Sequence, residues 1–132
     1  MAMIKGINHK GFHVVDMERS LDFYCNKLGF KKAFELNQPS GEPWIVYVKV
    51  ADGCFIELFY GGTKGVKNRA EHICFEVDDI QETADQLKKK GVPLEVEISQ
   101  GMALNYQFWI LDPDGNWIEF MEMNPESPHM RS

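Results

Sequence analysis

An internal repeat is the feature that most constrains how this chain can fold. When the second half of the sequence is aligned with the first, His9 matches His72 and Glu57 matches Glu119. The shift that aligns the histidines is one residue longer than the shift that aligns the glutamates, which corresponds to a single insertion between the helix and the hairpin. Similarity at a fixed spacing is typical of a duplicated structural unit, so each half predicts the architecture of the other.

Each half has the same expected order of elements, β-α-β-β-β. In the first half Asp16 is a candidate N-cap and Gly29 a candidate stop for one helix, and Asp79 and Gly91 take these places in the second half. The expected strands cover residues 7–15, 30–36, 44–50 and 54–60, then 71–77, 93–98, 105–111 and 116–122. The sequence therefore predicts an α+β fold of two βαβββ modules, whose sheets form a cup with the helices outside.

A length of 132 residues suits one domain with a real core. We expect a single domain over residues 1–123, made of repeats at about 5–60 and 70–123. Residues 61–69 are rich in glycine and are expected to form a linker or a lid. Residues 124–132 are polar and contain proline, which predicts a frayed tail.

Charge and composition exclude several classes of partner. The net charge is −6 and the lysines are dispersed apart from residues 88–90, which argues against nucleic acid or an anionic membrane surface. The sequence shows no signal peptide and no apolar run of membrane-spanning length. Three cysteines at unrelated spacings give neither a disulfide framework nor a zinc ribbon. We expect a cytoplasmic protein with free thiols that acts on a small molecule.

The repeated glutamates lie inside apolar strands, where an unpaired carboxylate is costly to bury. Side chains alternate along a strand, so each glutamate can share a face with the histidine of its own half. Two imidazoles and two carboxylates suit a divalent metal such as Ni, Co, Zn, Fe or Mn, with open positions left for substrate. The sequence therefore predicts metal ligation by His9, Glu57, His72 and Glu119.

Structural alternatives remain for each of these residues. A histidine at a strand start or a glutamate within a strand is usually structural, and duplication can preserve a structural pair as well as a ligand pair. The recurrence of both residues at matched positions favours the metal site. His13 shares the face of His9 and is either a substrate contact or a polar residue at the mouth of the site, whereas Glu76 is expected to be a charge at a strand end.

Four motifs carry a family likeness: NHKGFHVVDMERSLDFYCNKLGF, FIELFY, EHICFEVDDI and LDPDGNWIEFME. With them the chain resembles the vicinal oxygen chelate superfamily over about residues 5–123. This superfamily includes glyoxalase I (lactoylglutathione lyase), extradiol dioxygenases, fosfomycin-resistance enzymes, methylmalonyl-CoA epimerase and bleomycin-binding proteins. The first and the last of these motifs are specific for the superfamily and much less specific for the substrate of one member.

The resemblance implies a ligand set of His9, Glu57, His72 and Glu119, which is most similar to that of glyoxalase I. It implies proton transfer through a metal-stabilised enediolate on a small α-oxo or α-hydroxy carbonyl compound, or on its thiol adduct. Glu119 would be the principal base, and Glu57 a ligand that shares the proton transfer. It also implies a homodimer with sites at the interface, and the ligands of one site could come from one subunit or from two.

Two departures argue against glutathione as the thiol. His13 stands where glyoxalase I has an arginine, and Gly61 stands where it has an asparagine. Two other functions stay open. One is an Fe(II)-dependent ring-cleaving dioxygenase, although such enzymes use two histidines and one carboxylate, so a fourth ligand counts against it. The other is a non-catalytic small-molecule binding protein of the resistance type, with Trp44, Trp109 and Trp117 among its walls.

Overall fold

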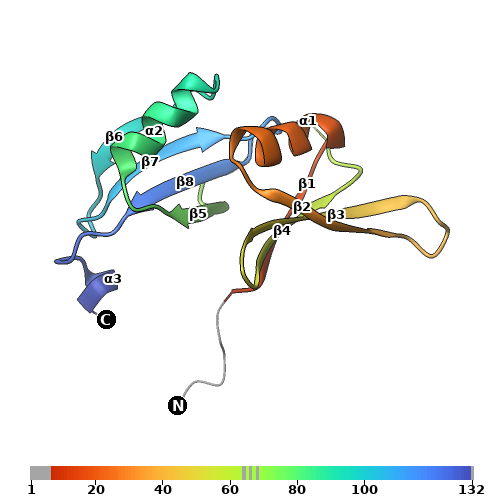
Figure 1. The fold of residues 1–132 in the computed structure, drawn as a ribbon, viewed down its shortest axis with the longest axis horizontal. Coiled ribbons are helices and arrows are strands. Elements are labelled where there is room, and N and C mark those ends of the chain that lie inside the picture. The colour runs from red at the N-terminus through yellow and green to blue at the C-terminus, as the bar shows by residue number, and fades with distance from the viewer. Residues whose placement is uncertain (1–6, 64, 66, 68, 132) are drawn as a thin grey trace, which may run out of the picture. The chain divides into compact units, whose positions relative to one another are not determined.

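The computed structural model describes residues 7–63, 65, 67 and 69–131, and the chain divides into two compact units, Met1–Lys64 and Gly65–Ser132. The first unit consists of β1 (His9–His13), α1 (Met17–Leu21), the π-helical turn η1 (Asp22–Lys27), β2 (Lys31–Asn37), β3 (Pro43–Ala51) and β4 (Cys54–Phe59) (Figure 1). Its four strands form one sheet in the order β1-β4-β3-β2, in which β1 is parallel to β4 and the other pairs are antiparallel.

The second unit repeats this plan. It consists of β5 (His72–Glu76), α2 (Ile80–Lys89), β6 (Val96–Gln100), β7 (Tyr106–Leu111) and β8 (Trp117–Glu122), followed by the short helix α3 (Pro128–Arg131). The sheet order is β5-β8-β7-β6, with β5 parallel to β8. The prediction of an α+β fold with two βαβββ modules is confirmed. No helix in the described part of the chain is long and apolar enough to cross a membrane.

The helices begin and end at the predicted residues. The Asp16 side chain accepts a hydrogen bond from the backbone N–H of Arg19 at 3.2 Å, and Asp79 accepts one from the N–H of Glu82 at 3.0 Å. These bonds satisfy N–H groups that have no partner within the first turn of a helix. Gly29 and Gly91 both have φ of 80°, the left-handed conformation that ends a helix.

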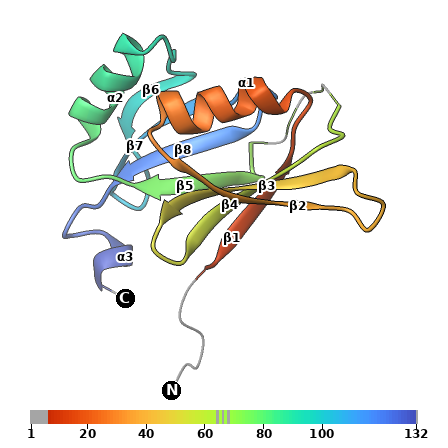
Figure 2. The ribbon, with the colours of Figure 1, turned by 45° about the vertical axis from the view of Figure 1, so that its right-hand side comes forward.

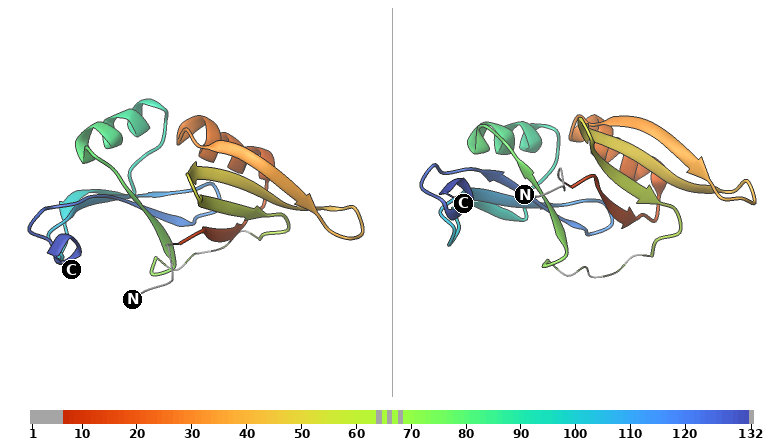
Figure 3. Two further views of the ribbon diagram at one scale, coloured as in Figure 1. Left: turned by 60° about the horizontal axis from the view of Figure 1, so that its bottom comes forward. Right: turned by 90° about the horizontal axis from the view of Figure 1, so that it is seen from below.

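Each sheet has one face turned to a core. In the first unit the side chains of Ile56 and Leu58 are fully buried, as are those of Val46 and Val48 on the neighbouring strand. The helical segment α1/η1 lies against this sheet and contributes Phe23 and Tyr24, among others, to the buried set (Figure 3). In the second unit α2 contacts β6, β7 and β8 (Figure 2). Its buried residues Ile80, Ala84 and Leu87 lie at helical spacing.

One predicted strand starts later in the structure than the sequence suggests. The strand expected over 93–98 begins at Val96 instead. The N–H of Val92 closes the end of α2 by donating to the Leu87 carbonyl, and Pro93 has no N–H to donate to a ladder. The tail expected to fray is hydrogen-bonded over its described part. The buried Asn105 accepts from the N–H of Asn124 at 2.8 Å, and its amide lies 3.0 Å from His129 Nδ1.

The glycine-rich segment after β4 includes one close contact. The N–H of Val14 donates to the Phe59 carbonyl, and the N–H of Gly62 donates to the Val14 carbonyl at 3.0 Å. A Cβ atom at Gly62 would lie 2.8 Å from both the N and the C of Val14. The absence of a side chain at this position is therefore what lets the segment run beside the end of β1. Residues 64, 66 and 68 of the expected linker lie outside the described residues.

Candidate functional site

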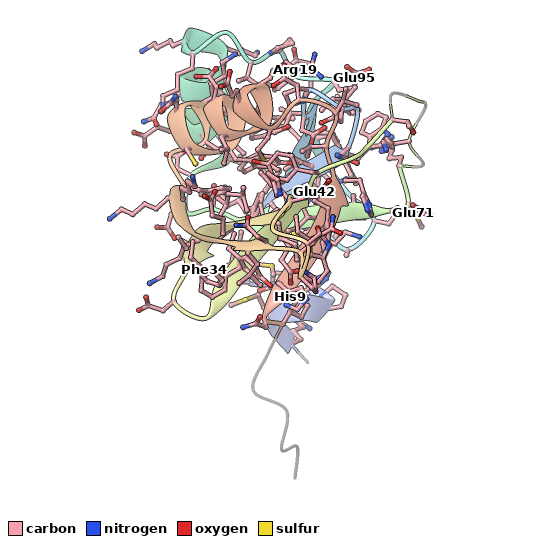
Figure 4. All side chains as sticks on the ribbon, turned by 90° about the vertical axis from the view of Figure 1, so that its right-hand side faces the viewer. His9, Arg19, Phe34, Glu42, Glu71 and Glu95 are labelled. Atoms are coloured by element: carbon pink, nitrogen blue, oxygen red, sulfur yellow. The ribbon has the colours of Figure 1, made fainter. Side chains whose placement is uncertain are left out.

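In the first unit, the fold brings His9 and Glu57 together. Glu57 lies in β4 and is buried, with 7% of its surface exposed. It pairs with Gly11 in the parallel ladder, so His9 lies on the same face, and His9 Nε2 is 2.7 Å from Glu57 Oε2. The other ring nitrogen, Nδ1, lies 2.8 Å from Asn8 Oδ1. Figure 4 labels His9 on β1 and Phe34 on β2, the two outer strands of this sheet.

In the second unit, the fold brings His72 and Glu119 together in the same way. Glu119 lies in β8 and is 6% exposed, and it pairs with Cys74 in the parallel ladder. His72 Nε2 is 3.3 Å from Glu119 Oε1. Its Nδ1 is 3.1 Å from the Arg69 carbonyl and 3.3 Å from that of Ala70. In both histidines, therefore, the Nδ1 atom faces an oxygen acceptor and Nε2 faces a buried carboxylate.

Two further side chains touch the glutamates. Tyr47 lies directly opposite Glu57 in the β3/β4 ladder. Burial, then the charge of Glu57 and the hydrogen bond to it, raise the pKa of the Tyr47 phenol. In the second unit burial, followed by the charge of Glu119 and a hydrogen bond to it, raises the pKa of the Cys74 thiol to about 12. Both groups are therefore protonated donors to a carboxylate at neutral pH.

Sequence reasoning missed Tyr47 and Cys74 as contacts of the glutamates. The deciding feature is register. A regular hairpin that turns at residues 52–53 would place Val48 opposite Glu57, but the ladder is irregular between Lys49 and Ala51, and this shift brings Tyr47 opposite Glu57. Cys74 lies two positions after His72, so it shares the face of His72 in an extended strand.

Aromatic rings surround both pairs. The ring of Phe34 stacks on Tyr47 with centroids 4.2 Å apart and an interplanar angle of 16°. In the second unit His72 meets the Trp109 ring edge to face at 4.7 Å, and the Arg69 guanidinium lies 4.3 Å from the Trp109 centroid. Of the predicted wall residues, Trp109 and Trp117 lie on the glutamate face of β7 and β8, as their register with Glu119 shows. Trp44 is 42% exposed and packs against Phe59.

His13 occupies the end of the same face as His9 and Glu57. Its ring packs on that of Phe59, with centroids 5.2 Å apart and an interplanar angle of 32°. It pairs with Phe59 in the ladder, two pairs beyond the Gly11–Glu57 pair. This position is at the periphery of the glutamate face, where a side chain can meet a ligand.

The donor atoms fit a divalent cation. Two ligands bound at about 2.0–2.1 Å in adjacent positions of an octahedral ion stand about 2.9 Å apart. The observed nitrogen-to-oxygen distances of 2.7 Å and 3.3 Å lie on either side of that value. Hydrogen bonding at Nδ1 leaves Nε2 as the ligating atom, which is the usual arrangement of metal-bound histidines. Each unit supplies two donors, and among the described residues no group of three or more His, Cys, Asp or Glu side chains is placed to hold a metal ion by itself.

Comparison with known proteins gives consistent matches over most of the chain. Residues 6–120 match the model of the Glyoxalase/Bleomycin resistance protein/Dioxygenase superfamily. A protein of Synechocystis sp. described as a probable lactoylglutathione lyase is 32% identical over 123 residues, which cover 86% of this chain and 92% of that protein. The lactoylglutathione lyase of Schizosaccharomyces pombe is 29% identical over 92% of this chain. The match covers 49% of that enzyme, so the chain spans about half its length.

Solved structures agree with this family match. A member of the glyoxalase/bleomycin resistance protein/dioxygenase superfamily from Sphaerobacter thermophilus has a TM-score of 0.74 to this structure at 27% identity. The superposition covers 92% of this chain and 100% of that protein. The similarity thus extends over both βαβββ units.

Proposed function

The chain belongs to the Glyoxalase/Bleomycin resistance protein/Dioxygenase superfamily, and from this we propose that it is a metal-dependent lyase or isomerase of the glyoxalase I type. Its substrate would be a small α-oxo or α-hydroxy carbonyl compound, or the thiol adduct of one. The single observation that supports this most directly is the recurrence, in both units, of a buried glutamate held against the Nε2 atom of a histidine. Relatives named lactoylglutathione lyase support the same reaction class.

We propose that His9, Glu57, His72 and Glu119 together hold one divalent metal, which would be Ni, Co, Zn, Fe or Mn. When bound, the metal would supply Lewis-acid stabilisation of negative charge on a substrate oxygen. It would also offset the desolvation of two carboxylates that are each more than nine-tenths buried. The ligands would come from one chain, or one pair from each of two chains in a homodimer.

Glu119 is the better candidate for the base. Its contact to histidine is 3.3 Å, compared with 2.7 Å for Glu57, and its second donor is a thiol, which is a weak donor. Glu119 is therefore the less tightly held of the two carboxylates, and the resemblance to glyoxalase I assigns the base to its position. Glu119 would remove a proton from one carbon of the substrate and return it to the neighbouring carbon, so the net reaction is an isomerisation. Glu57 would remain a ligand and share the transfer.

His13 would contact the polar end of the substrate. It lies beyond Glu57 on the same face, with its ring fixed against Phe59. A histidine at this position lacks the planar guanidinium with which an arginine would bind a carboxylate through two hydrogen bonds. The presence of His13 in place of an arginine supports a thiol other than glutathione. The substrate screen must therefore include several thiols.

Metal analysis and a small set of variants test the proposal. The purified protein should contain a divalent metal, and Glu119→Gln should lower turnover by about 10²–10⁴-fold, the usual contribution of a general base. Glu76→Gln is a matched control, because Glu76 lies on the same face of β5 as His72 but at its end. This control should retain activity. The substrates are methylglyoxal with glutathione and with other small thiols.

The outcomes separate the remaining functions. Absence of metal, together with unchanged ligand binding in Glu119→Gln, would exclude catalysis at this site and leave a binding protein. A bound metal with cleavage of catechols and no isomerisation would indicate a ring-cleaving dioxygenase. Turnover of a thiol adduct that is lost in Glu119→Gln and kept in Glu76→Gln would establish the proposed reaction.

A further inference from the structure

The two glutamates occupy matched places but receive hydrogen bonds from different strands. The alignment of the halves that matches Glu57 with Glu119 also matches Tyr47 with Trp109, and each lies directly opposite the glutamate of its own unit. Burial, then the charge of Glu57 and hydrogen bonding to it, raise the pKa of the Tyr47 phenol, whose residue faces Glu57 across the ladder. The Trp109 Nε1 atom is buried and has no hydrogen-bond partner among the described residues. Among the described residues, therefore, β3 supplies a donor to Glu57, whereas Trp109 on the corresponding strand β7 supplies none to Glu119.

The outer strand shows the opposite difference. Gly11 lies opposite Glu57 in the parallel ladder and has no side chain, whereas its counterpart Cys74 lies opposite Glu119. Burial, then the charge of Glu119 and hydrogen bonding to it, raise the pKa of the Cys74 thiol, which also lies 4.0 Å from the Phe75 carbonyl. Each glutamate thus meets a histidine and a second donor. For Glu57 this donor is a phenol, and for Glu119 it is a thiol. A hydroxyl that donates to a carboxylate makes a strong, charge-assisted bond, while an S–H group is a weak donor.

The phenol is held rigidly. Phe34 on β2 stacks on the Tyr47 ring at 4.2 Å, and Phe55 on β4 meets it edge to face at 6.5 Å and 77°. Aromatic neighbours on both adjacent strands restrict the ring, so the hydroxyl has few alternative positions. A donor fixed in this way can hold a carboxylate in one orientation.

We propose that Tyr47 is a positioning residue of the candidate site. Its hydroxyl fixes the Glu57 carboxylate as a metal ligand, and this leaves Glu119 as the less restricted carboxylate and the principal base. The inference rests on the proposed function, because it assigns different roles to two glutamates of one metal site. Tyr47 is not one of the four proposed ligands, and the proposal is that the loss of its hydroxyl changes metal binding.

Tyr47→Phe tests this directly, since it removes one oxygen and keeps the aromatic stack. The Ni²⁺ affinity of the metal-free protein is measured by calorimetry, and the visible spectrum of the Co²⁺-loaded protein reports on the coordination of the ion. We expect the affinity to fall by about tenfold or more, the usual effect of losing a hydrogen bond to a ligand. The Co²⁺ spectrum should change as well, because a loosely held carboxylate coordinates differently.

Three controls accompany this variant. Tyr106→Phe makes the same chemical change on the opposite face of β7 from Trp109, where the side chain is 39% exposed, and should leave affinity and spectrum unchanged. Cys74→Ala should weaken binding less than Tyr47→Phe does. Phe34→Leu keeps the hydroxyl but removes the stacked ring, and should give an intermediate loss.

The failure of this inference can be told apart from failure of the proposed function. If the wild-type protein binds none of the five candidate metals, Ni²⁺ included, both the proposed function and this inference fall. If the wild-type protein binds Ni²⁺ and Tyr47→Phe binds it within twofold with the same Co²⁺ spectrum, the role of Tyr47 alone is wrong. Equal losses in Tyr47→Phe and Tyr106→Phe would also overturn it, since the effect would then be a general loss of packing.

Discussion

Gly62→Ala should destabilise the protein far more than any other exchange of glycine for alanine at a residue with ordinary backbone angles. The new Cβ would lie 2.8 Å from the N and the C of Val14 and 2.9 Å from the C of His13. Carbon atoms in contact normally stay about 3.5–4.0 Å apart. The obstructing atoms belong to the backbone at the end of β1, so no side-chain rotation can relieve the overlap.

The expected magnitude follows from two contributions. Overpacking of this kind costs about 1–3 kcal/mol. Moving the segment away also weakens the hydrogen bond from the Gly62 N–H to the Val14 carbonyl, which contributes about 0.5–1.5 kcal/mol. We therefore expect a loss of about 2–4 kcal/mol in the free energy of unfolding, or roughly 8–16 °C in Tm for a domain of this size.

Two other glycines serve as internal controls. A Cβ at Gly101 would lie 2.9 Å from Gln107 Oε1, which is the far end of a flexible side chain, and a Cβ at Gly65 would meet no atom within 4 Å. Gly101→Ala should therefore cost less than about 1 kcal/mol, and Gly65→Ala should be within about 0.5 kcal/mol of wild type. Urea unfolding followed by tryptophan fluorescence measures all three. If Gly62→Ala matches Gly65→Ala, the contact with Val14 does not constrain the fold.

Three further predictions concern the caps, a thiol and the tail. Asp16→Ala and Asp79→Ala should each lower the free energy of unfolding by about 1 kcal/mol in urea titrations, because each removes an N-cap hydrogen bond, and no change would contradict the capping role. At pH 8 the Cys74 thiol should react with iodoacetamide several hundredfold more slowly than an unperturbed cysteine, because its pKa is raised to about 12. Glu119→Gln should speed this reaction by removing the charge that raises the pKa, and mass spectrometry of the labelled peptides measures both rates. Asn105→Ala should cost about 1–3 kcal/mol, since it leaves the Asn124 N–H without its acceptor, and an exposed exchange such as Asn37→Ala should be neutral.

The repeat made the fold and the histidine–glutamate pairs accessible from the sequence. Alternation along a strand places Glu57 and its neighbours Phe55 and Phe59 on one face, and the ladder with β1 has this register. The matching strands of the second half, aligned with a single one-residue insertion, then transfer the same geometry to Glu119. Local sequence was sufficient to predict which side chains share a sheet face, because strand periodicity and turn residues determine this.

The remaining features depend on contacts that are distant in sequence. The buried amide of Asn105 holds a tail that composition alone marks as polar, because its partners Asn124 and His129 lie well beyond it in the chain. The start of β6 depends on Val92, which completes the end of α2, and on Pro93, which cannot donate. In the sequence Tyr47 is indistinguishable from any other aromatic residue of a strand. Its contact with Glu57 follows only from the observed register of the β3/β4 ladder.

The parallel pairing of β1 with β4 affects the order in which the strands of the first unit unfold. His9 and Glu57 lie near opposite ends of the first unit's sequence and meet only where its first strand joins its last. That first strand is five residues long and lies at the edge of its sheet, and such strands are among the first to detach in local unfolding. Detachment of β1 would separate the imidazole from the carboxylate while the β2–β4 meander stays folded. A cation bound by this pair would close a loop across the whole unit, so its occupancy should slow hydrogen exchange in β1 more than in β3.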